Sequence, residues 1–315
     1  MRTIAFLPTL LTAALVCLLP AAPAQAQAAR TFVSAAGSDS NNCANVATPC
    51  RHLAAAYAAT AANGEIYVLD PANYGSLTIT GPVSIEGHGW ASIAAPSGGS
   101  NPAAITINAN TGDKINIIGV VLDGTALVPT TGINFNNGGS LTVRDSVIRN
   151  FTQDGIVFAA TSSSLSQFFV SNTLIADNGG NGFTAGGNSV NGVLDHVQLE
   201  NNEIRGLSVG SVGTINVTVT DSVIAGNGGP GIFATAITPG ATANVMVQNS
   251  TIANNFIGFD ADGTVVTISV TRSTITGNTY GWLTSMGGVV LSYGDNNIDG
   301  NTNVNTEPPN PLIYK

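Results

Sequence analysis

The sequence predicts an all-β solenoid built from coils of about 25 residues. Three columns of aligned residues support this fold class. In the first column, a glycine followed by a large apolar residue recurs in steps of 23 to 27 residues, at Gly132, Gly155, Gly182, Gly206, Gly231, Gly258 and Gly281. The second column is apolar and runs through Leu122, Ile148, Ile175, Leu199, Ile224, Ile252, Ile275 and Ile298.

The third column lies three residues before the apolar one and predicts a sharp corner in each coil. Its members are Gly119, Asp145, Asn172, His196, Asp221, Asn249, Arg272 and Asp295. A coil of this length has room for three short strands, and stacking coils about 4.8 Å apart aligns equivalent residues into ladders. A leucine-rich repeat would need an L-x-x-L-x-L-x-x-N pattern, which the sequence lacks, and a β-sandwich would not align its columns.

Residues 1–26 are predicted to be a signal peptide. They contain one basic residue, an apolar run too short for a membrane span, and a small-residue cleavage site at Ala24-Gln25-Ala26. The protein is therefore expected to be secreted, periplasmic or displayed at the cell surface. Export to an oxidising compartment predicts a disulfide between Cys43 and Cys50.

The remaining chain divides into three parts. Residues 27–64 are expected to hold a strand at 30–36, the disulfide loop and a capping helix at 50–62, with Thr48 as N-cap and Pro49 at the first helical position. Residues 65–300 form the solenoid, beginning with short strands bounded by glycine and proline. Residues 301–315, with three prolines, are expected to form a tail that either lies over the last coil or frays.

Composition excludes two classes of partner. Charged residues make up 9% of the chain, and the formal net charge is −9. The few basic residues form no patch, so we expect no nucleic-acid partner. No segment after residue 26 has 18 unbroken apolar residues, so no membrane span is expected. The sequence does not indicate an oligomeric state.

The repeat Gly-Ile … Val-x-Asp/Asn-Ser-x-Ile-x-x-Asn resembles the coil of right-handed parallel β-helix proteins of the pectin-lyase-like superfamily. The opening of the chain, with Ile66-Tyr67-Val68 and Val83-x-Ile85-x-Gly87, is similar to their N-terminal region. The resemblance implies a right-handed single-stranded parallel β-helix, and in that family the short corner often carries an asparagine ladder. This superfamily includes pectate and pectin lyases, polygalacturonases, alginate epimerases, tailspike hydrolases and adhesin-like shafts.

Candidate catalytic residues follow from strand alternation at the glycine column. The residue before each glycine and the residue two after it are expected to face solvent. Charges on that face are few, and Arg205 is its basic residue. Because the resemblance implies an arginine base in lyases, the catalytic candidates are Arg205 with Asp154 or Asp260.

The candidates for glycan contact lie on the same face. Carboxylates and amides can bind sugar hydroxyls, and aromatic rings offer an apolar surface. These candidates are Asn181, Glu203, Phe233, Asp262 and Tyr280.

We expect no cofactor. The resemblance allows Ca²⁺, but Asp154 and Asp260 each lie two coils from Arg205, too far apart to form a cage of six to eight oxygens. His88 and His196 are expected to be turn residues, because the motifs that accompany a catalytic histidine in the family are missing.

The leading functional expectation is an exported protein that contacts polysaccharide or a cell-surface glycan along one solenoid face. One alternative is a polysaccharide lyase or glycoside hydrolase. The other is a structural, adhesin-like shaft without a site, because a fold alone does not define an activity.

Overall fold

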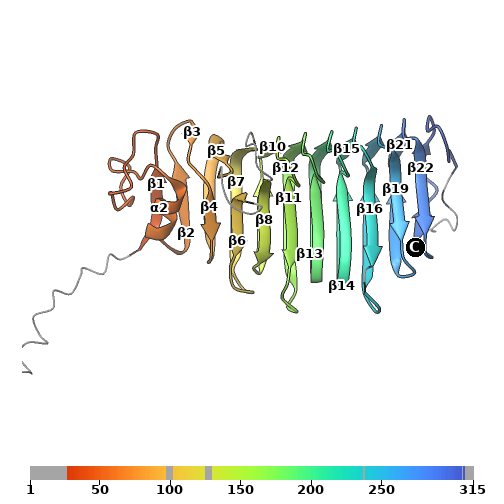
Figure 1. The fold of residues 1–315 in the computed structure, drawn as a ribbon, viewed down its shortest axis with the longest axis horizontal. Helices are drawn as coiled ribbons and strands as arrows, with labels where there is room; N and C mark the ends of the chain where they lie inside the picture. The colour runs from red at the N-terminus through yellow and green to blue at the C-terminus, as the bar shows by residue number, and fades with distance from the viewer. Residues whose placement is uncertain (1–26, 97–101, 125–129, 237, 307, 309–315) are drawn as a thin grey trace, which may run out of the picture.

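The computed structural model describes residues 27–96, 102–124, 130–236, 238–306 and 308. The chain winds into a parallel solenoid whose coils stack from the N-terminal to the C-terminal end (Figure 1). Every strand pairing that joins successive coils is parallel, and the long strands bend around corners to join three faces. We call these faces sheets 1, 2 and 3. The predicted right-handed parallel β-helix of about 25 residues per coil is confirmed.

Sheet 1 contains the strands that follow the glycine column. Its members are β4 (Leu77–Ile79), β6 (Ala103–Asn108), β8 (Thr131–Asn137), β11 (Ile156–Ala160), the start of β13 (Phe183–Glu200), the start of β14 (Leu207–Thr220), β16 (Pro230–Ala236), β19 (Ile257–Asp262) and β22 (Tyr280–Ser285).

Sheet 2 contains the strand that precedes the corner in each coil. Its members are β1 (Ala28–Val33), β2 (Thr60–Val68), the start of β5 (Val83–Ala94), the start of β7 (Lys114–Asp123), β9 (Ser140–Arg144), the start of β12 (Ser166–Ala176), the middle of β13, the end of β14, β17 (Thr242–Gln248), β20 (Val266–Thr271) and β23 (Val289–Ser292).

Sheet 3 contains the short strand after the corner. Its members are β3 (Ala72–Asn73), the ends of β5, β7, β12 and β13, and β10 (Val147–Arg149), β15 (Val223–Ala225), β18 (Thr251–Ala253), β21 (Thr274–Thr276) and β24 (Asn297–Ile298).

The core lies inside the coils, because alternate side chains of all three sheets point inward. The apolar column ending at Ile298 is fully buried from Leu122 to Ile275. Aromatic rings fill the centre of the solenoid. Phe135 stacks on Phe158 with ring centroids 4.2 Å apart, and Phe168 packs against both Phe158 and Phe183. Burial of this apolar surface is the main force that holds the coils together.

The predicted corner is confirmed between sheets 2 and 3. Residues of the third column from Gly119 to Arg272 adopt positive φ there, from 47° at Asn172 and Arg272 to 64° at Gly119, whereas Asp295 in the last coil does not. The small residue after the corner completes the turn. Ser250, for example, accepts a hydrogen bond from the backbone N–H of Ser222 and donates its hydroxyl to the carbonyl of Gln248.

A continuous asparagine ladder lies in the turn between sheets 3 and 1, rather than at the corner where the resemblance implied one. In the middle of the ladder, each side-chain amide donates to the Oδ1 of the next asparagine and to a carbonyl of the preceding coil, as Asn227 does. The Oδ1 of Asn227, for example, accepts hydrogen bonds from both the backbone N–H and the side-chain NH₂ of Asn202. The ladder residues are buried and fully paired, as buried polar groups must be: Asn178, Asn202, Asn227, Asn255, Asn278 and Asn301.

The N-terminal end is capped by helix α2 (Leu53–Ala59), which buries Leu53 and Ala56. The predicted helix at 50–62 is therefore too long at both ends, and its N-cap is His52 rather than Thr48. The Asp39 carboxylate holds the extended chain before the helix by accepting the backbone N–H groups of residues 51 and 52. After the helix, Thr60 already belongs to strand β2.

The predicted disulfide between Cys43 and Cys50 is present beside this cap.

The start of the C-terminal tail runs along the last coil, where Trp282 Nε1 donates to the carbonyl of Thr306 at 3.0 Å. The predicted signal peptide at 1–26 and the end of the tail lie outside the described residues. Within the described part of the chain, no helix has the length and apolar character needed to cross a membrane.

The ladder generates a stability prediction. Replacing Asn227 with alanine should lower the free energy of unfolding by about 2–4 kcal/mol, because the amides and carbonyl that it pairs are left buried without partners. The measurement is the urea midpoint, read with an unchanged denaturant slope. The control is Asn244→Ala, an exposed asparagine in another amide row, which should change stability by about 0.5 kcal/mol or less. Equal effects of the two substitutions would contradict the role of burial.

Candidate functional site

The outward side of sheet 1 carries most of the candidate residues. Parallel register brings one outward residue from each coil into a single row across the strands. Asp260 and Phe233 are direct neighbours in this row, as alternation predicted. The row consists of Val157, Thr184, Ser208, Phe233, Asp260 and Leu283.

Arg205 lies in the turn that enters sheet 1, immediately before Gly206. Its guanidinium carbon lies 4.2 Å from the centre of the Phe233 ring, which belongs to the next coil. Its Nε is buried and has no hydrogen-bond partner among the described residues. Burial lowers the pKa of Arg205, and the charges of Asp260 and Asp154 oppose that shift. The guanidinium is therefore stacked on a ring and flanked by two carboxylates.

Asp154 is fixed by the neighbouring coil rather than free in solvent. It accepts the backbone N–H of Asn181 at 2.8 Å and the Thr184 hydroxyl at 2.5 Å. The Asn181 side-chain amide donates to Thr184 Oγ1 at 3.0 Å, and its Oδ1 is buried with no partner in the described part of the chain. An unpaired acceptor on Asn181 and an unpaired donor on Arg205 thus lie in equivalent positions of adjacent coils.

Asp260 lies on the other side of Arg205, one coil beyond Phe233. Burial raises its pKa above the ordinary value of 3.8, and repulsion from Asp262 raises it further. The positive charge of Arg205 acts in the opposite direction. Asp262 points to the same side of β19 and accepts a hydrogen bond of 2.7 Å from the Ser285 hydroxyl. Burial and the neighbouring Asp262 charge therefore keep the pKa of Asp260 above its ordinary value.

Two candidates stand apart from this group. Glu203 is exposed, and no ion pair joins it to Arg205 in the described part of the chain. Tyr280 lies three coils from Arg205, where its ring packs against Phe256 with centroids 5.8 Å apart. The structure brings together Asp154, Asn181, Arg205, Phe233, Asp260 and Asp262, and sequence reasoning missed the contribution of Thr184.

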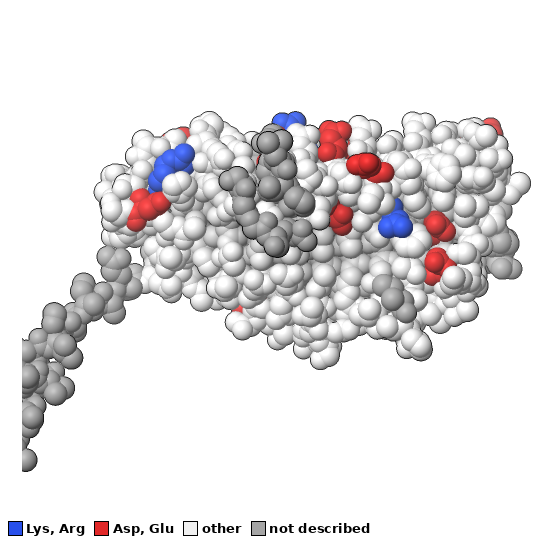
Figure 2. All heavy atoms as spheres, in the orientation of Figure 1, with Lys and Arg blue, Asp and Glu red and all other residues white. Residues whose placement is uncertain are grey.

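The surface around this group carries little charge. Figure 2 views the molecule from the side on which the sheet 1 strands are labelled in Figure 1, and the described surface there is mostly uncharged with isolated acidic and basic side chains. A ligand on this face would therefore meet a small charged centre within a broad neutral surface.

One group of potential metal ligands lies elsewhere. Asp195, His196 and Asp221 place ligand atoms within 4.8 Å of one another at the corner between sheets 2 and 3. His196 has a φ of 53° and its Nδ1 lies 2.7 Å from Asp195 Oδ1, which agrees with a turn role. His88, with a φ of 56°, is likewise a turn residue. The carboxylates near Arg205 do not converge on one point, since Asp154 and Asp260 lie on opposite sides of it.

Comparison with known proteins identifies the fold. The family described as "Right handed beta helix region" matches residues 131–305, more than half of the 315 residues. Among solved structures, the A-module of an Azotobacter vinelandii mannuronan C-5 epimerase is 16% identical, with a TM-score of 0.49 over 80% of this chain and 91% of that chain. A second A-module of that enzyme type from the same organism is 18% identical, with a TM-score of 0.43 over 80% and 90%. A pectate lyase is 15% identical, with a TM-score of 0.49 over 88% and 72%. No curated protein sequence matches this chain.

The raised pKa of Asp260 generates a titration prediction. In a ¹³C NMR titration, the carboxyl carbon of Asp260 should titrate above 3.8. Asp262→Asn should lower this pKa by removing a repulsive charge, and Arg205→Met should raise it by removing an attractive one. Asp299→Asn, at an exposed distant site, should leave it unchanged.

The same shift fixes the sign of the pH dependence of stability. A raised pKa in the folded state means that folding favours the protonated carboxyl, so the contribution of Asp260 is full below pH 3.8 and is lost as the pH rises through the shifted pKa. An Asp260 that titrates at or below 3.8 would contradict this description of the site.

Proposed function

The chain belongs to the right-handed β-helix family, and on that premise we propose that it binds a glycan along the outward side of sheet 1, centred on Arg205. The single observation that carries the proposal is the pair of unpaired buried atoms, Arg205 Nε and Asn181 Oδ1, in adjacent coils. Leaving such groups unpaired costs about 1–3 kcal/mol each. A sugar hydroxyl is both a donor and an acceptor, so it can pair with both groups once the side chains turn outward.

The neighbouring side chains favour a carbohydrate ligand. The planar guanidinium of Arg205 loses less entropy per hydrogen bond than a more flexible group when its N–H groups bind hydroxyls, and the neighbouring Phe233 ring adds an apolar surface. Asp154, Asp260 and Asp262 supply acceptors on both sides of that centre. Since they come from different coils, an extended chain lying across the strands would contact several of them at once.

A polysaccharide lyase or glycoside hydrolase is the second candidate function, and the raised pKa of Asp260 favours it. Asp260 and Asp262 are two residues apart on one strand, about 6.6 Å by the strand rise. Glycosidases use a protonated and an ionised carboxyl about 5–9.5 Å apart. In this scheme Asp260 is the acid, Asp262 the second carboxyl group and Arg205 a group that binds sugar hydroxyls. In the lyase scheme Arg205 is the base, and its lowered pKa favours the neutral form that can accept a proton.

We further propose that the protein is exported, with residues 1–26 removed as a signal peptide. The disulfide between Cys43 and Cys50 supports an oxidising compartment. N-terminal sequencing of the protein recovered from its native compartment should find Gln27 as the first residue. A chain that keeps Met1 there would contradict removal.

The glycan proposal is tested on an array of neutral and acidic polysaccharides. At least one should bind the wild-type protein, and Arg205→Ala should weaken binding by about tenfold or more, because charged hydrogen bonds contribute about 1.5–3 kcal/mol. The control is Arg149→Ala, which removes an exposed arginine paired with Asp123 on another face and should leave binding unchanged.

Two readouts separate the functional classes. New reducing ends that disappear with Asp260→Asn, or unsaturated products that disappear with Arg205→Ala, would identify an enzyme. Binding without products would identify a binding protein. Absence of both across the whole panel would contradict the glycan proposal and leave the structural shaft.

A further inference from the structure

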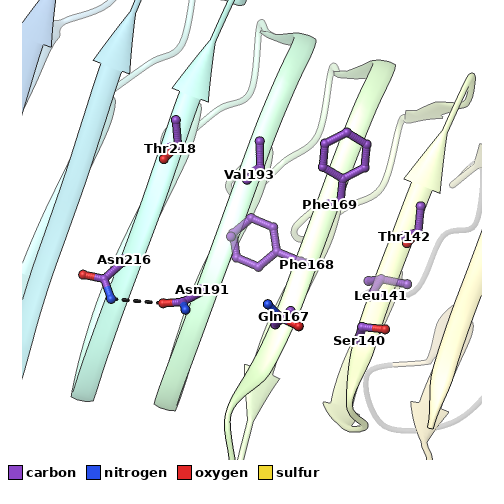
Figure 3. A pocket seen from close by; sticks show the side chains of 11 residues that line it. Ser140, Leu141, Thr142, Gln167, Phe168, Phe169, Asn191, Val193, Asn216 and Thr218 are labelled. Atoms are coloured by element: carbon purple, nitrogen blue, oxygen red, sulfur yellow. Dashed lines mark hydrogen bonds between the residues drawn. The ribbon is translucent and has the colours of Figure 1, made fainter. Parts of the chain in front are cut away.

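A hollow of about 570 Å³ lies on the outward side of sheet 2, away from Arg205. Its wall is formed by strands β9, β12, β13 and β14, and its side chains are arranged in two rows (Figure 3). One row contains the amides of Gln167, Asn191 and Asn216, and the other contains Phe169 and Val193. The two rows are outward positions of the same strands, separated by the two-residue period of a β-strand.

The amide row is held in place from within the protein. Gln167, Asn191, Asn216 and Asn244 are in register across four coils. Asn244 donates to Asn216 Oδ1 and Asn216 donates to Asn191 Oδ1, each at 3.0 Å. Each of these amides keeps a second N–H for a ligand. The side chain of Gln167, at the open end of the row, has no partner among the described residues.

The second row offers an apolar surface. Phe169 points outward from its strand and is 37% exposed. Its register neighbours on the adjacent coils are Thr142 and Val193. The floor beneath is rigid because the buried Phe168 ring packs under Gly192. A Cβ added to that glycine would lie 1.9 Å from the ring. The exposed ring is thus presented on a fixed base beside a row of amides.

The lining excludes two classes of ligand. None of the residues that line the hollow is ionisable. Lys114 lies one coil beyond the lining residue Ser140, so an anion inside the hollow would have no cation in the lining to pair with, and the formal net charge of −9 would repel it. A protein partner would need a larger apolar core at its interface than one phenylalanine and one valine supply. An uncharged sugar fits both rows, since its hydroxyls pair with amides and its C–H face packs on an aromatic ring.

We propose that this hollow is a second binding site, specific for neutral oligosaccharides. The bound chain lies across β9, β12, β13 and β14, with one sugar ring packed on Phe169. Its hydroxyls bind the amides of Gln167, Asn191 and Asn216, which repeat about every 4.8 Å along the solenoid. The site shares no residue with the group around Arg205, so it does not depend on the function proposed there.

The test is titration calorimetry of the full chain with cellohexaose, mannohexaose and maltohexaose. At least one neutral hexaose should bind, and Phe169→Ala should weaken binding by about tenfold or more. Phe169→Tyr keeps the ring and should retain affinity. The matched control is Phe256→Ala, which removes a phenylalanine that is 50% exposed outside the hollow and should have no effect.

Three outcomes would overturn this proposal. The first is that none of the neutral hexaoses binds. The second is binding that is lost in Arg205→Ala but kept in Phe169→Ala, which would assign the sugar to sheet 1 and leave the first proposal standing. The third is a dimer, seen by sedimentation velocity, that Phe169→Ala dissociates without any effect on sugar binding, which would make the hollow an interface between two copies.

Discussion

The buried asparagine ladder is the interaction that orders the turns leading into sheet 1, and the geometry of the candidate site depends on it. It runs from Asn178 to Asn301, and Asn305 closes its end by accepting the backbone N–H of Asn301. The ladder fixes the turn that leads into sheet 1, and the candidate site uses that same turn. Asn181 and Arg205 each follow a ladder asparagine by three residues. Asp154 follows Phe151, whose N–H binds the first ladder amide. The same ladder therefore fixes both the stacking of these turns and the positions of Asn181 and Arg205.

Much of this fold could be predicted because the solenoid converts sequence period directly into position. The glycine and apolar columns identified the sheets, and two-residue alternation placed Phe233 and Asp260 on the outward side. The predictions that failed concerned features that tertiary contacts determine. The helix begins later than its sequence suggests because Asp39 accepts the backbone N–H groups of residues 51 and 52, which precede it. The Ile-x-x-Asn pattern was visible, but its burial depends on a turn conformation that periodicity does not specify.

The candidate site shows the same limit at the level of side chains. Spacing selected Arg205 and Asp154 but could not predict that the guanidinium stacks on Phe233 or that Thr184 fixes the Asp154 carboxylate. These contacts depend on rotamers of long side chains across neighbouring coils. The hollow on sheet 2 was missed for another reason. Its amides and its ring are ordinary outward residues, and only their register across coils gathers them. The solenoid thus presents two faces of different chemistry, one with a charged centre and one uncharged.

The most direct test of the central claim is a crystal structure of the protein with the best-binding oligosaccharide from the polysaccharide panel. The account predicts sugar density on the outward side of sheet 1, with hydroxyls bonded to Arg205 and Asn181 and a chain that crosses several coils. A well-ordered oligosaccharide that contacts neither residue, including one confined to the hollow on sheet 2, would contradict it.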